Sequence, residues 1–388
     1  MKFFEEDLLP KLQNIPTPFY YYDLRILDKT LASINSAIQG LPYIVHYAMK
    51  ANANIPVLKK IKEAGFGIDT VSGKEIERAI EQGFVGNQIA FAGVGKTDEE
   101  ILLGLKHKIF TFNVESLAEL KVIDELAKGQ NTLANVAIRL NPNVNAKTHH
   151  YITTGLEENK FGINYWELQD LFEVLQNLKN IELRGLHFHL GSQIRDLSVF
   201  KMLCNRVNEL QAEFRERNIN LEHINVGGGL GVNYTQPDEE LIPDFQSFFD
   251  VFKNFIELLP YQKLHFELGR SIIAQSAALI SKVLYIKKGI KTDFAILDAG
   301  MTELIRPALY QSSHHIQNLN KLNQTYDHKF DVVGPICESS DCFGKAIPLP
   351  KSERGDLFAI RTAGAYGQVM SSQYNLRELA KTVYYEEL

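Results

Sequence analysis

The sequence predicts an α/β plus all-β protein: a (β/α)8 barrel of the TIM type with a C-terminal β-barrel or sandwich domain. Three observations predict this fold. Short runs of β-branched and aromatic residues alternate with longer segments of helical periodicity over the first two thirds of the chain. After about Leu268 the alternation gives way to strand-like runs joined by loops. The length of 388 residues is enough for one large barrel and a second domain.

Eight strand-like runs form the alternating part, and each is expected to supply one barrel strand: Ile44–Lys50, Gly67–Ser72, Gln88–Gly93, Ile109–Val114, Val136–Asn141, Leu183–Gly191, His223–Gly227 and Leu264–Gly269. The clearest helical segments between them are Lys74–Gln82, Ser116–Ala127, Tyr165–Leu178, Phe200–Arg217 and Pro243–Leu258. Strands that alternate with helices are parallel, and eight such units fit a closed barrel. A doubly wound open sheet is the alternative, but it usually has a glycine-rich turn after the first strand, where this chain has Lys50.

The last third of the chain is expected to form a mainly antiparallel β domain. Its strand-like runs are Leu279–Ile286, Phe294–Leu297, Phe330–Val333, Asp356–Thr362 and Lys381–Tyr385. The run Phe19–Tyr22, near the N-terminus, has the same composition and is expected to join that sheet. We therefore place the barrel at residues 24–266, and the β domain at residues 1–23 and 267–388.

Composition narrows the class of protein. Lys and Arg number 41 against 47 Asp and Glu, giving a net charge of -6, so no nucleic-acid partner is expected. The three cysteines cannot form a paired framework and fit a reducing compartment. The most apolar stretch, Ser271–Ile286, is interrupted by polar residues, and the N-terminus lacks an apolar signal core. We expect a cytoplasmic protein without a membrane partner.

Polar residues gather where the predicted strands end, which in a (β/α)8 barrel is the end that carries the active site. They are Lys50, Ser72, Arg139, His189, Ser192, Gly227 to Gly229, Glu267 and Arg270. A partly desolvated Lys50 could form a Schiff base with an aldehyde, whereas a solvent-facing lysine would be inert. Consecutive glycines after a strand can present backbone amides to a phosphate, or simply form a tight turn.

The remaining candidates also carry two interpretations each. Arg270 could clamp a phosphate, and a buried Glu267 could pair with a protonated pyridine nitrogen; alternatively the two form a structural pair. His187 and His189 share one strand face but have no third ligand at suitable spacing, so no metal is expected. We interpret His189 as a ring that can stack on a flat cofactor and His187 as a core histidine. Cys337, next to Glu338, could donate a proton or be a structural thiol.

Together these groups meet the needs of pyridoxal phosphate. The sequence also resembles the fold-type III pyridoxal-phosphate-dependent amino acid decarboxylases over nearly its whole length. Six motifs carry the resemblance: Tyr47–Asn52, His187–Ser192, Asn225–Gly231, Glu267–Arg270, Cys337–Ser339 and Gly364–Gly367. The resemblance implies an alanine-racemase-like barrel with a β domain, assembled as a homodimer.

Within that family, the segment Asp298–Tyr310 is most similar to members that convert meso-2,6-diaminopimelate to L-lysine and carbon dioxide, the last step of lysine biosynthesis. Arg306 would bind the distal carboxylate of this substrate in a forked pair, and Glu338 would accept its ammonium. The alternatives are a polyamine-type decarboxylase acting on ornithine, arginine or carboxynorspermidine, and a non-catalytic protein that binds pyridoxal phosphate. A racemase fits less well, because racemases usually place an arginine near the ring nitrogen, where this chain has Glu267.

The resemblance implies a role for each matching residue. Lys50, His189, Glu267 and Cys337 are expected to be catalytic, with Cys337 returning a proton after carbon dioxide leaves. Cofactor-binding residues are expected to be Lys50, His189, Ser192, Gly227, Gly228, Gly229, Glu267, Gly269, Arg270 and Tyr366. Substrate-binding residues are expected to be Arg270, Arg306, Tyr310, Glu338 and Tyr366. Cys337 and Glu338 are expected to reach the neighbouring subunit's barrel, so that the homodimer shares its active sites.

Three positions depart from the family's usual residues. Leu268 replaces a proline, Thr302 an asparagine and Ser340 a glycine. None of these changes removes a charged or covalent role. Leu268 precedes Gly269 and Arg270, so it is the departure most able to affect phosphate binding.

Overall fold

The chain divides into two compact units in the computed structural model, which describes residues 3–5, 8–144 and 160–388. The barrel unit comprises Leu31–Gly231 and Asp244–Gly269, and the β unit comprises Met1–Thr30, Val232–Pro243 and Arg270–Leu388. The division differs from the expected boundaries, because the loop after the glycine run leaves the barrel unit and packs with the β unit. This loop, residues 232–243, contains no strand or helix. Hydrophobic periodicity therefore could not show that it belongs to the β unit.

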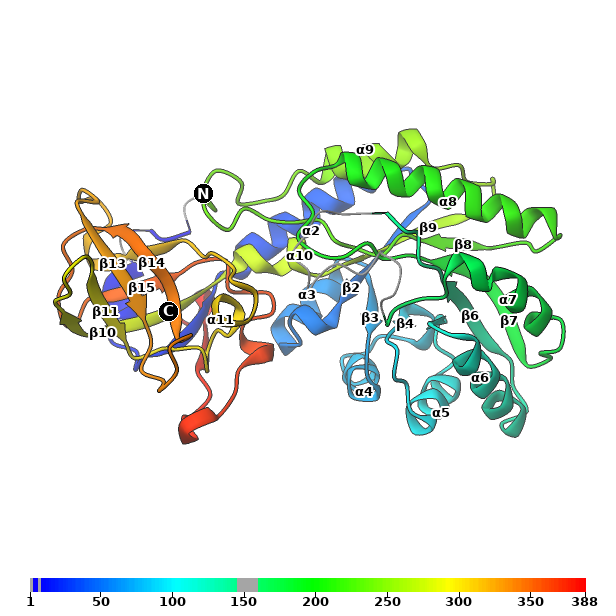
Figure 1. Ribbon diagram of the computed structural model, residues 1–388, viewed down its shortest axis with the longest axis horizontal. Coiled ribbons are helices and arrows are strands. Elements are labelled where there is room, and N and C mark those ends of the chain that lie inside the picture. Colours follow the sequence, from blue (N-terminus) through cyan, green and yellow to red (C-terminus); the bar gives the residue numbers. More distant parts are fainter. Residues whose placement is uncertain (1–2, 6–7, 145–159) are drawn as a thin grey trace. The chain divides into compact units, whose positions relative to one another are not determined.

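The barrel unit is a closed barrel of eight parallel strands, as predicted (Figure 1). The strands are β2 Tyr43–Ala48, β3 Gly67–Thr70, β4 Ile89–Phe91, β5 Thr111–Val114, β6 Ala134–Arg139, β7 Ile181–His187, β8 His223–Asn225 and β9 Lys263–Leu268. Each overlaps one of the eight predicted runs, and β9 pairs with β2 to close the ring. One expectation was wrong in detail: Lys50 lies beyond β2, in the short 3-10 turn Met49–Ala51.

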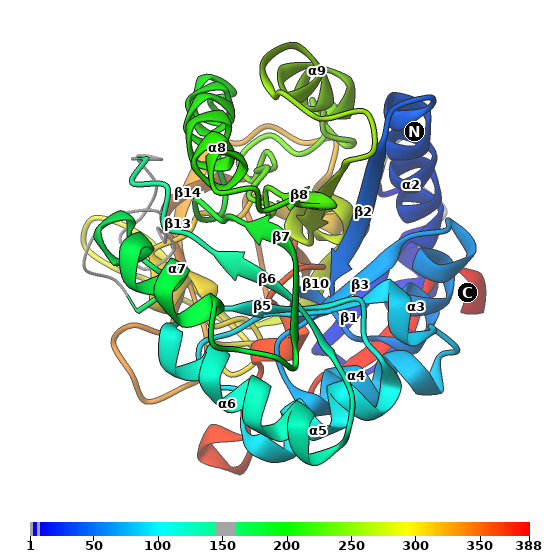
Figure 2. The same cartoon turned by 90° about the vertical axis from the view of Figure 1, so that its right-hand side faces the viewer.

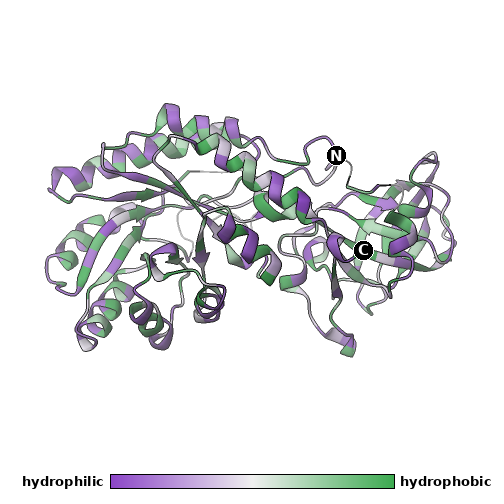
Figure 3. Cartoon of the chain, turned by 180° about the vertical axis from the view of Figure 1, so that it is seen from behind, coloured by the Kyte–Doolittle hydropathy of each residue, from purple (hydrophilic) through white to green (hydrophobic). Residues whose placement is uncertain are grey.

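The helices that cover the barrel follow its strands in sequence, and those labelled α3 to α8 lie outside the ring of strands in Figure 2. The chain's helices are α1 Leu8–Leu12, α2 Leu24–Ile38, α3 Ile55–Glu63, α4 Gly73–Glu81, α5 Asp98–His107, α6 Leu117–Gly129, α7 Leu168–Leu175, α8 Ser198–Glu216, α9 Phe245–Phe255, α10 Arg270–Ile273 and α11 Arg306–Tyr310. The barrel helices carry both apolar and polar segments (Figure 3). Side-chain caps at Ser72, Thr97 and Ser116 fix where α4, α5 and α6 begin.

Aromatic and imidazole rings fill part of the barrel interior. The Phe110 ring stacks on His265 with centroids 4.8 Å apart, and His46 and His223 pack against the same two rings. Glycine makes room for two of them: Gly67 is in register with His46, and Gly185 with His223. A Cβ at either glycine would lie within 2.5 Å of the neighbouring imidazole. In both places a glycine on one strand makes room for the imidazole of a histidine on the neighbouring strand.

The β unit is built on an eight-stranded sheet in which most neighbouring strands are antiparallel, as predicted. Its strands are β1 Phe19–Tyr22, β10 Ala277–Lys287, β11 Asp293–Leu297, β12 Ile316–Asn318, β13 His328–Val333, β14 Cys342–Leu349, β15 Leu357–Ile360 and β16 Lys381–Tyr384. The N-terminal strand β1 joins this sheet, as predicted, and lies between β10 and β16. The strands β12 and β14 were not predicted; β14 contains a glycine and a proline, which weaken the strand pattern.

A compact apolar core holds the β unit together. Phe19, Tyr21, Ala278, Ile280 and Ala359 from three paired strands pack with Phe3, Phe4, Leu8 and Leu12 of the N-terminal segment. No helix in the described parts of the chain is long and apolar enough to cross a membrane.

Candidate active site

Lys50 forms an ion pair inside the mouth of the barrel unit. Its Nζ lies 2.7 Å from Oδ2 of Asp69 on β3, the strand next to β2. Burial and the nearby Glu267 raise the pKa of Asp69, and the Lys50 ammonium opposes that rise. Sequence reasoning missed Asp69; the signal was the one carboxylate of the predicted strand Gly67–Ser72, which follows the strand of the lysine.

The carboxylate of Glu267 on β9 is held by three side chains of the barrel interior. Its Oε1 accepts hydrogen bonds from Nδ2 of Asn113 (3.0 Å) and Nδ2 of Asn225 (2.7 Å), and its Oε2 lies 2.9 Å from Nε2 of His187. Burial alone would raise the pKa of Glu267, but the contact with His187 and the charge of Lys50 hold it below its ordinary value. The site therefore keeps a carboxylate ionised deep in the barrel.

His189 follows β7 and presents a neutral ring. Burial lowers its pKa well below the ordinary value, and the positive charges of Arg139 and Lys50 lower it further. Its Nδ1 accepts the backbone N–H of Gly228 at 3.3 Å, which fixes the orientation of the ring. A neutral, oriented imidazole suits stacking against a flat aromatic cofactor.

The glycine run after β8 requires glycine at each position. The φ angles of Gly227 and Gly229 are +68° and +109°, which L-amino acids with a side chain rarely adopt. A Cβ at Gly228 would lie 2.0 Å from the carbonyl oxygen of Glu267, and one at Gly269 would lie 3.1 Å from the Cβ atoms of Ala48 and Ala51. Bare backbone at this rim can approach a phosphate closely.

The barrel unit thus fits pyridoxal phosphate, on four features of its own side chains and backbone. It offers a lysine amine, a neutral imidazole, an ionised carboxylate for a ring nitrogen and a glycine cradle for a phosphate. Ser192 follows the same strand as His189 and is half-buried. Two other polar residues that we placed at the rim have structural partners: Ser72 caps α4, and Arg139 forms an ion pair at 2.7 Å with Glu115.

The β unit holds a separate cluster of two buried arginines. Nη1 of Arg270 lies 2.5 Å from the hydroxyl oxygen of Tyr234, and its guanidinium carbon is 4.8 Å from the ring centroid of Tyr366. The guanidinium carbon of Arg306 is 5.0 Å from the Tyr234 ring centroid and 5.7 Å from that of Tyr310. Tyr234 was not predicted, because it lies in the loop that leaves the barrel unit.

Arg306 is the more unusual of the two arginines, because it is 4% exposed and its Nε has no hydrogen-bond partner among the described residues. Burial lowers its pKa, and the charge of Arg270 acts in the same direction. A buried guanidinium of this kind is a strong binding site for an anion.

Cys337 and Glu338 lie on an exposed loop of the β unit. The carboxylate of Glu338 accepts a hydrogen bond from the hydroxyl of Tyr374 at 2.9 Å. Buried Asp341 shapes this loop, since its two carboxylate oxygens accept the backbone N–H groups of Met301 and Ile336 at 2.6 and 2.7 Å. The roles expected of Cys337 and Glu338 stay predictions.

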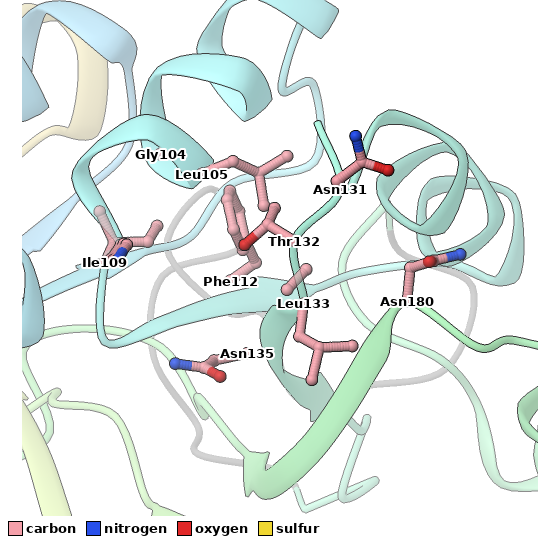
Figure 4. Close-up of a pocket in the computed structure, with 11 residues that line it drawn as sticks. Gly104, Leu105, Ile109, Phe112, Asn131, Thr132, Leu133, Asn135 and Asn180 are labelled. Carbon is pink, nitrogen blue, oxygen red and sulfur yellow. The ribbon is translucent and has the colours of Figure 1, made fainter. Parts of the chain in front are cut away.

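A hollow of about 640 Å³ lies elsewhere on the barrel unit, beside the points where β5 and β6 begin (Figure 4). It is lined by Gly104, Leu105, Lys108, Ile109, Phe112, Asn131, Thr132, Leu133, Ala134, Asn135 and Asn180. None of these is a predicted site residue. Since catalytic groups of such barrels lie where the strands end, the hollow is not the candidate active site.

Comparison with known proteins agrees with the geometry of the barrel unit. Residues 25–274 match the protein family described as pyridoxal-dependent decarboxylase, pyridoxal binding domain. A diaminopimelate decarboxylase of Bacteroides thetaiotaomicron is 56% identical over 381 residues, which cover 98% of each sequence. One from Helicobacter pylori is 40% identical over 367 residues, covering 94% of this chain and 89% of the relative.

Solved structures show the same relationship. The diaminopimelate decarboxylase from Helicobacter pylori complexed with L-lysine superposes with a TM-score of 0.91 at 38% identity, covering 98% of this chain and 94% of that chain. The lysine/ornithine decarboxylase from Vibrio vulnificus complexed with putrescine gives a TM-score of 0.85 at 21% identity, covering 99% of both chains. The second match shows a shared fold alone.

Proposed function

The chain belongs to the pyridoxal-dependent decarboxylases, and from that premise we propose that it converts meso-2,6-diaminopimelate to L-lysine and carbon dioxide. Relatives that match nearly the whole chain are named diaminopimelate decarboxylase. The proposed reaction removes the carboxylate at the D-configured centre and leaves the other amino acid head intact.

The observation that carries the choice of substrate is Arg306. This guanidinium is buried and has no ion-pair partner within the described ranges, so the β unit itself leaves its charge uncompensated. The distal carboxylate of diaminopimelate would supply the missing anion in a forked pair. Ornithine and the polyamine precursors present a cation at that end, which Arg306 would repel.

Pyridoxal phosphate is the proposed cofactor. Lys50 would bind its aldehyde, His189 would stack on its ring, and Glu267 would accept a hydrogen bond from its ring nitrogen. Ser192 and the glycines Gly227, Gly228, Gly229 and Gly269 would surround its phosphate, joined by Arg270 and Tyr366. When bound, the cofactor supplies an electron sink for the pair left by the departing carboxylate.

The β unit would complete the chemistry. Arg306, Tyr310 and Tyr366 would orient the substrate with Arg270, and Glu338 would accept the distal ammonium. Cys337 would donate a proton to the carbon that lost its carboxylate. Because Cys337 and Glu338 are exposed in the single chain, we propose that they serve the barrel of a second copy in a homodimer.

Product analysis tests this proposal. The purified protein, supplied with pyridoxal phosphate, should release carbon dioxide and L-lysine in equal amounts from meso-diaminopimelate. Ornithine, arginine and carboxynorspermidine are assayed in parallel as comparison compounds. Release from one of these instead would replace the proposed substrate while leaving the family intact, and cofactor uptake without any release would favour a non-catalytic carrier.

A further inference from the structure

The two oxygens of the Glu267 carboxylate are not equivalent. Oε1 receives two donors, the amides of Asn113 and Asn225, which occupy both of its in-plane lone pairs. Oε2 receives one, at 2.9 Å from Nε2 of His187, and keeps one lone pair for another donor. All four side chains are at least nine-tenths buried, so water does not compete for these positions.

One of the two ring nitrogens of His187 has a hydrogen-bond partner among the described residues. Its Nδ1 is buried without a hydrogen-bond partner in the described part of the chain, so the bond to Glu267 is the one that justifies burying an imidazole there. With Glu267 ionised, the proton must lie on Nε2 of His187, which then donates to Oε2. His187 is therefore a core histidine that also contacts the candidate active site.

We propose that His187 is a positioning residue that turns Oε2 of Glu267 toward the pyridine nitrogen of the cofactor and keeps the proton on that nitrogen. The inference deepens the proposed function and rests on it, because it assumes that pyridoxal phosphate binds at Lys50.

The physical argument concerns the basicity of one oxygen. A buried carboxylate with few donors becomes more basic, because its charge is poorly solvated. The contact with His187 lowers the pKa of Glu267 against the effect of burial. Without that donor, Oε2 would be basic enough to take the proton from the ring nitrogen. A ring without that proton accepts electrons less readily, so carboxylate loss would slow.

Asn113 and Asn225 cannot replace His187 in this role. Both asparagines donate to Oε1. Among the described donors, His187 is the one that donates to Oε2 and so lowers the basicity of that oxygen. Loss of either asparagine would loosen the carboxylate without removing the donor on the oxygen that faces the ring nitrogen.

The test follows the protonation of the ring nitrogen directly. Protein loaded with pyridoxal phosphate that carries ¹⁵N in its ring is examined by NMR across a pH series, as wild type and as His187→Phe. The phenylalanine keeps a ring but lacks the donor. We expect a protonated nitrogen signal throughout in wild type, and a signal that moves toward the unprotonated position as pH rises in the variant. The value of kcat should fall by about ten- to one-hundredfold with KM little changed.

Two further variants separate positioning from mere packing. His187→Gln places an amide donor near the position of Nε2 and should restore most of the wild-type nitrogen signal and kcat. His223→Phe removes another buried imidazole of the barrel interior, whose Nε2 has no partner among the described residues, and should leave the nitrogen signal unchanged. Should His187→Phe fail to fold, His187→Asn carries the same prediction, because its shorter amide reaches only the position of Nδ1.

The outcomes distinguish the two proposals. A wild-type enzyme that decarboxylates diaminopimelate, together with a His187→Phe nitrogen signal identical to wild type at every pH, would overturn the role of His187 alone. The role of His187 would also be overturned if the nitrogen signal of His187→Gln matched that of His187→Phe. A wild-type protein that takes up no pyridoxal phosphate would overturn the proposed function and this inference together.

Discussion

Nζ of Lys50 lies 2.7 Å from Oδ2 of Asp69, and this ion pair ties the turn after β2 to the neighbouring strand β3. Ala48, two residues before Lys50, is the register partner of Asp69, so the strand pairing itself brings the two side chains together. Asp69 is fully buried, whereas the Lys50 side chain is 37% exposed. Asp69 thus anchors the charged end of the lysine, while the Lys50 side chain stays partly exposed.

Replacement of Lys50 should abolish covalent cofactor binding. Lys50→Ala removes the amine and leaves Asp69 without its partner, while Lys50→Arg keeps a cation opposite Asp69 but cannot form a Schiff base. Both variants should lose the visible absorbance of the bound cofactor and all decarboxylation, and Lys50→Arg should retain more stability. An unchanged spectrum in either variant would refute the assignment of Lys50.

Gly228→Ala should weaken cofactor binding and destabilise the barrel unit. The added Cβ would lie 2.0 Å from the carbonyl oxygen of Glu267, so backbone must move. Overpacking of this kind costs about 1–3 kcal/mol in free energy of unfolding. Gly95→Ala is the matched control, because a Cβ there meets nothing within 4 Å. Equal stability and cofactor affinity in the two variants would contradict the close approach at Gly228.

Acid should destabilise the barrel unit through its interior histidines. Burial lowers the pKa of His223 to about 3, and it also lowers the pKa values of His46 and His265. Around His223, His187 and Arg184 disfavour a positive charge on the ring, whereas Glu267 favours one. The folded protein therefore binds fewer protons than the unfolded chain. Stability is complete above the unfolded-state value of about 6.5 and falls as pH drops from there toward 3.

Urea unfolding across this pH range measures the effect. Each such histidine contributes a slope of at most about 1.4 kcal/mol per pH unit to the free energy of unfolding. His223→Phe should reduce the slope. A free energy of unfolding that does not change between about pH 7 and 5 would show that these rings are not held neutral.

Cys337→Ala should lower kcat by about a hundredfold, the effect of removing a proton donor, without weakening cofactor binding. Most of the proposed cofactor-binding residues lie in the barrel unit, and Cys337 lies on the exposed loop of the β unit. Cys342→Ala, at the first residue of β14, is the matched control and should retain wild-type kcat. An undiminished kcat in Cys337→Ala would point to another donor.

Much of the fold could be predicted because its signals are local. Each barrel strand is a short apolar run followed by a helix, and caps such as Ser72 and Ser116 mark where helices begin. The loop 232–243 could not be predicted, since no periodic pattern shows that it leaves one unit and packs with the other. The strand β14 was missed for a similar reason, because its glycine and proline obscure the alternation.

The candidate residues could be picked out from the sequence where polar groups or glycines stand at or just beyond the end of a strand, as at Lys50, the glycine run and Glu267. The partners of those groups were not. Asp69, Asn113 and Asn225 act across neighbouring or distant strands, and their role depends on which way each side chain points inside the closed barrel. His187 is buried, as expected of a core histidine. Its 2.9 Å contact with Glu267 could not be predicted, because it depends on the pairing of strands far apart in the sequence.

The most direct test of the central claim is the ratio of kcat/KM for meso-diaminopimelate to that for L-ornithine, measured in wild type and in Arg306→Met. Loss of a buried charged pair costs about 2–5 kcal/mol, so the ratio should fall by at least about thirtyfold in the variant. Arg354→Met, at an exposed arginine of the β unit, should leave the ratio unchanged. A ratio equal in wild type and Arg306→Met would contradict the claim that Arg306 selects the distal carboxylate.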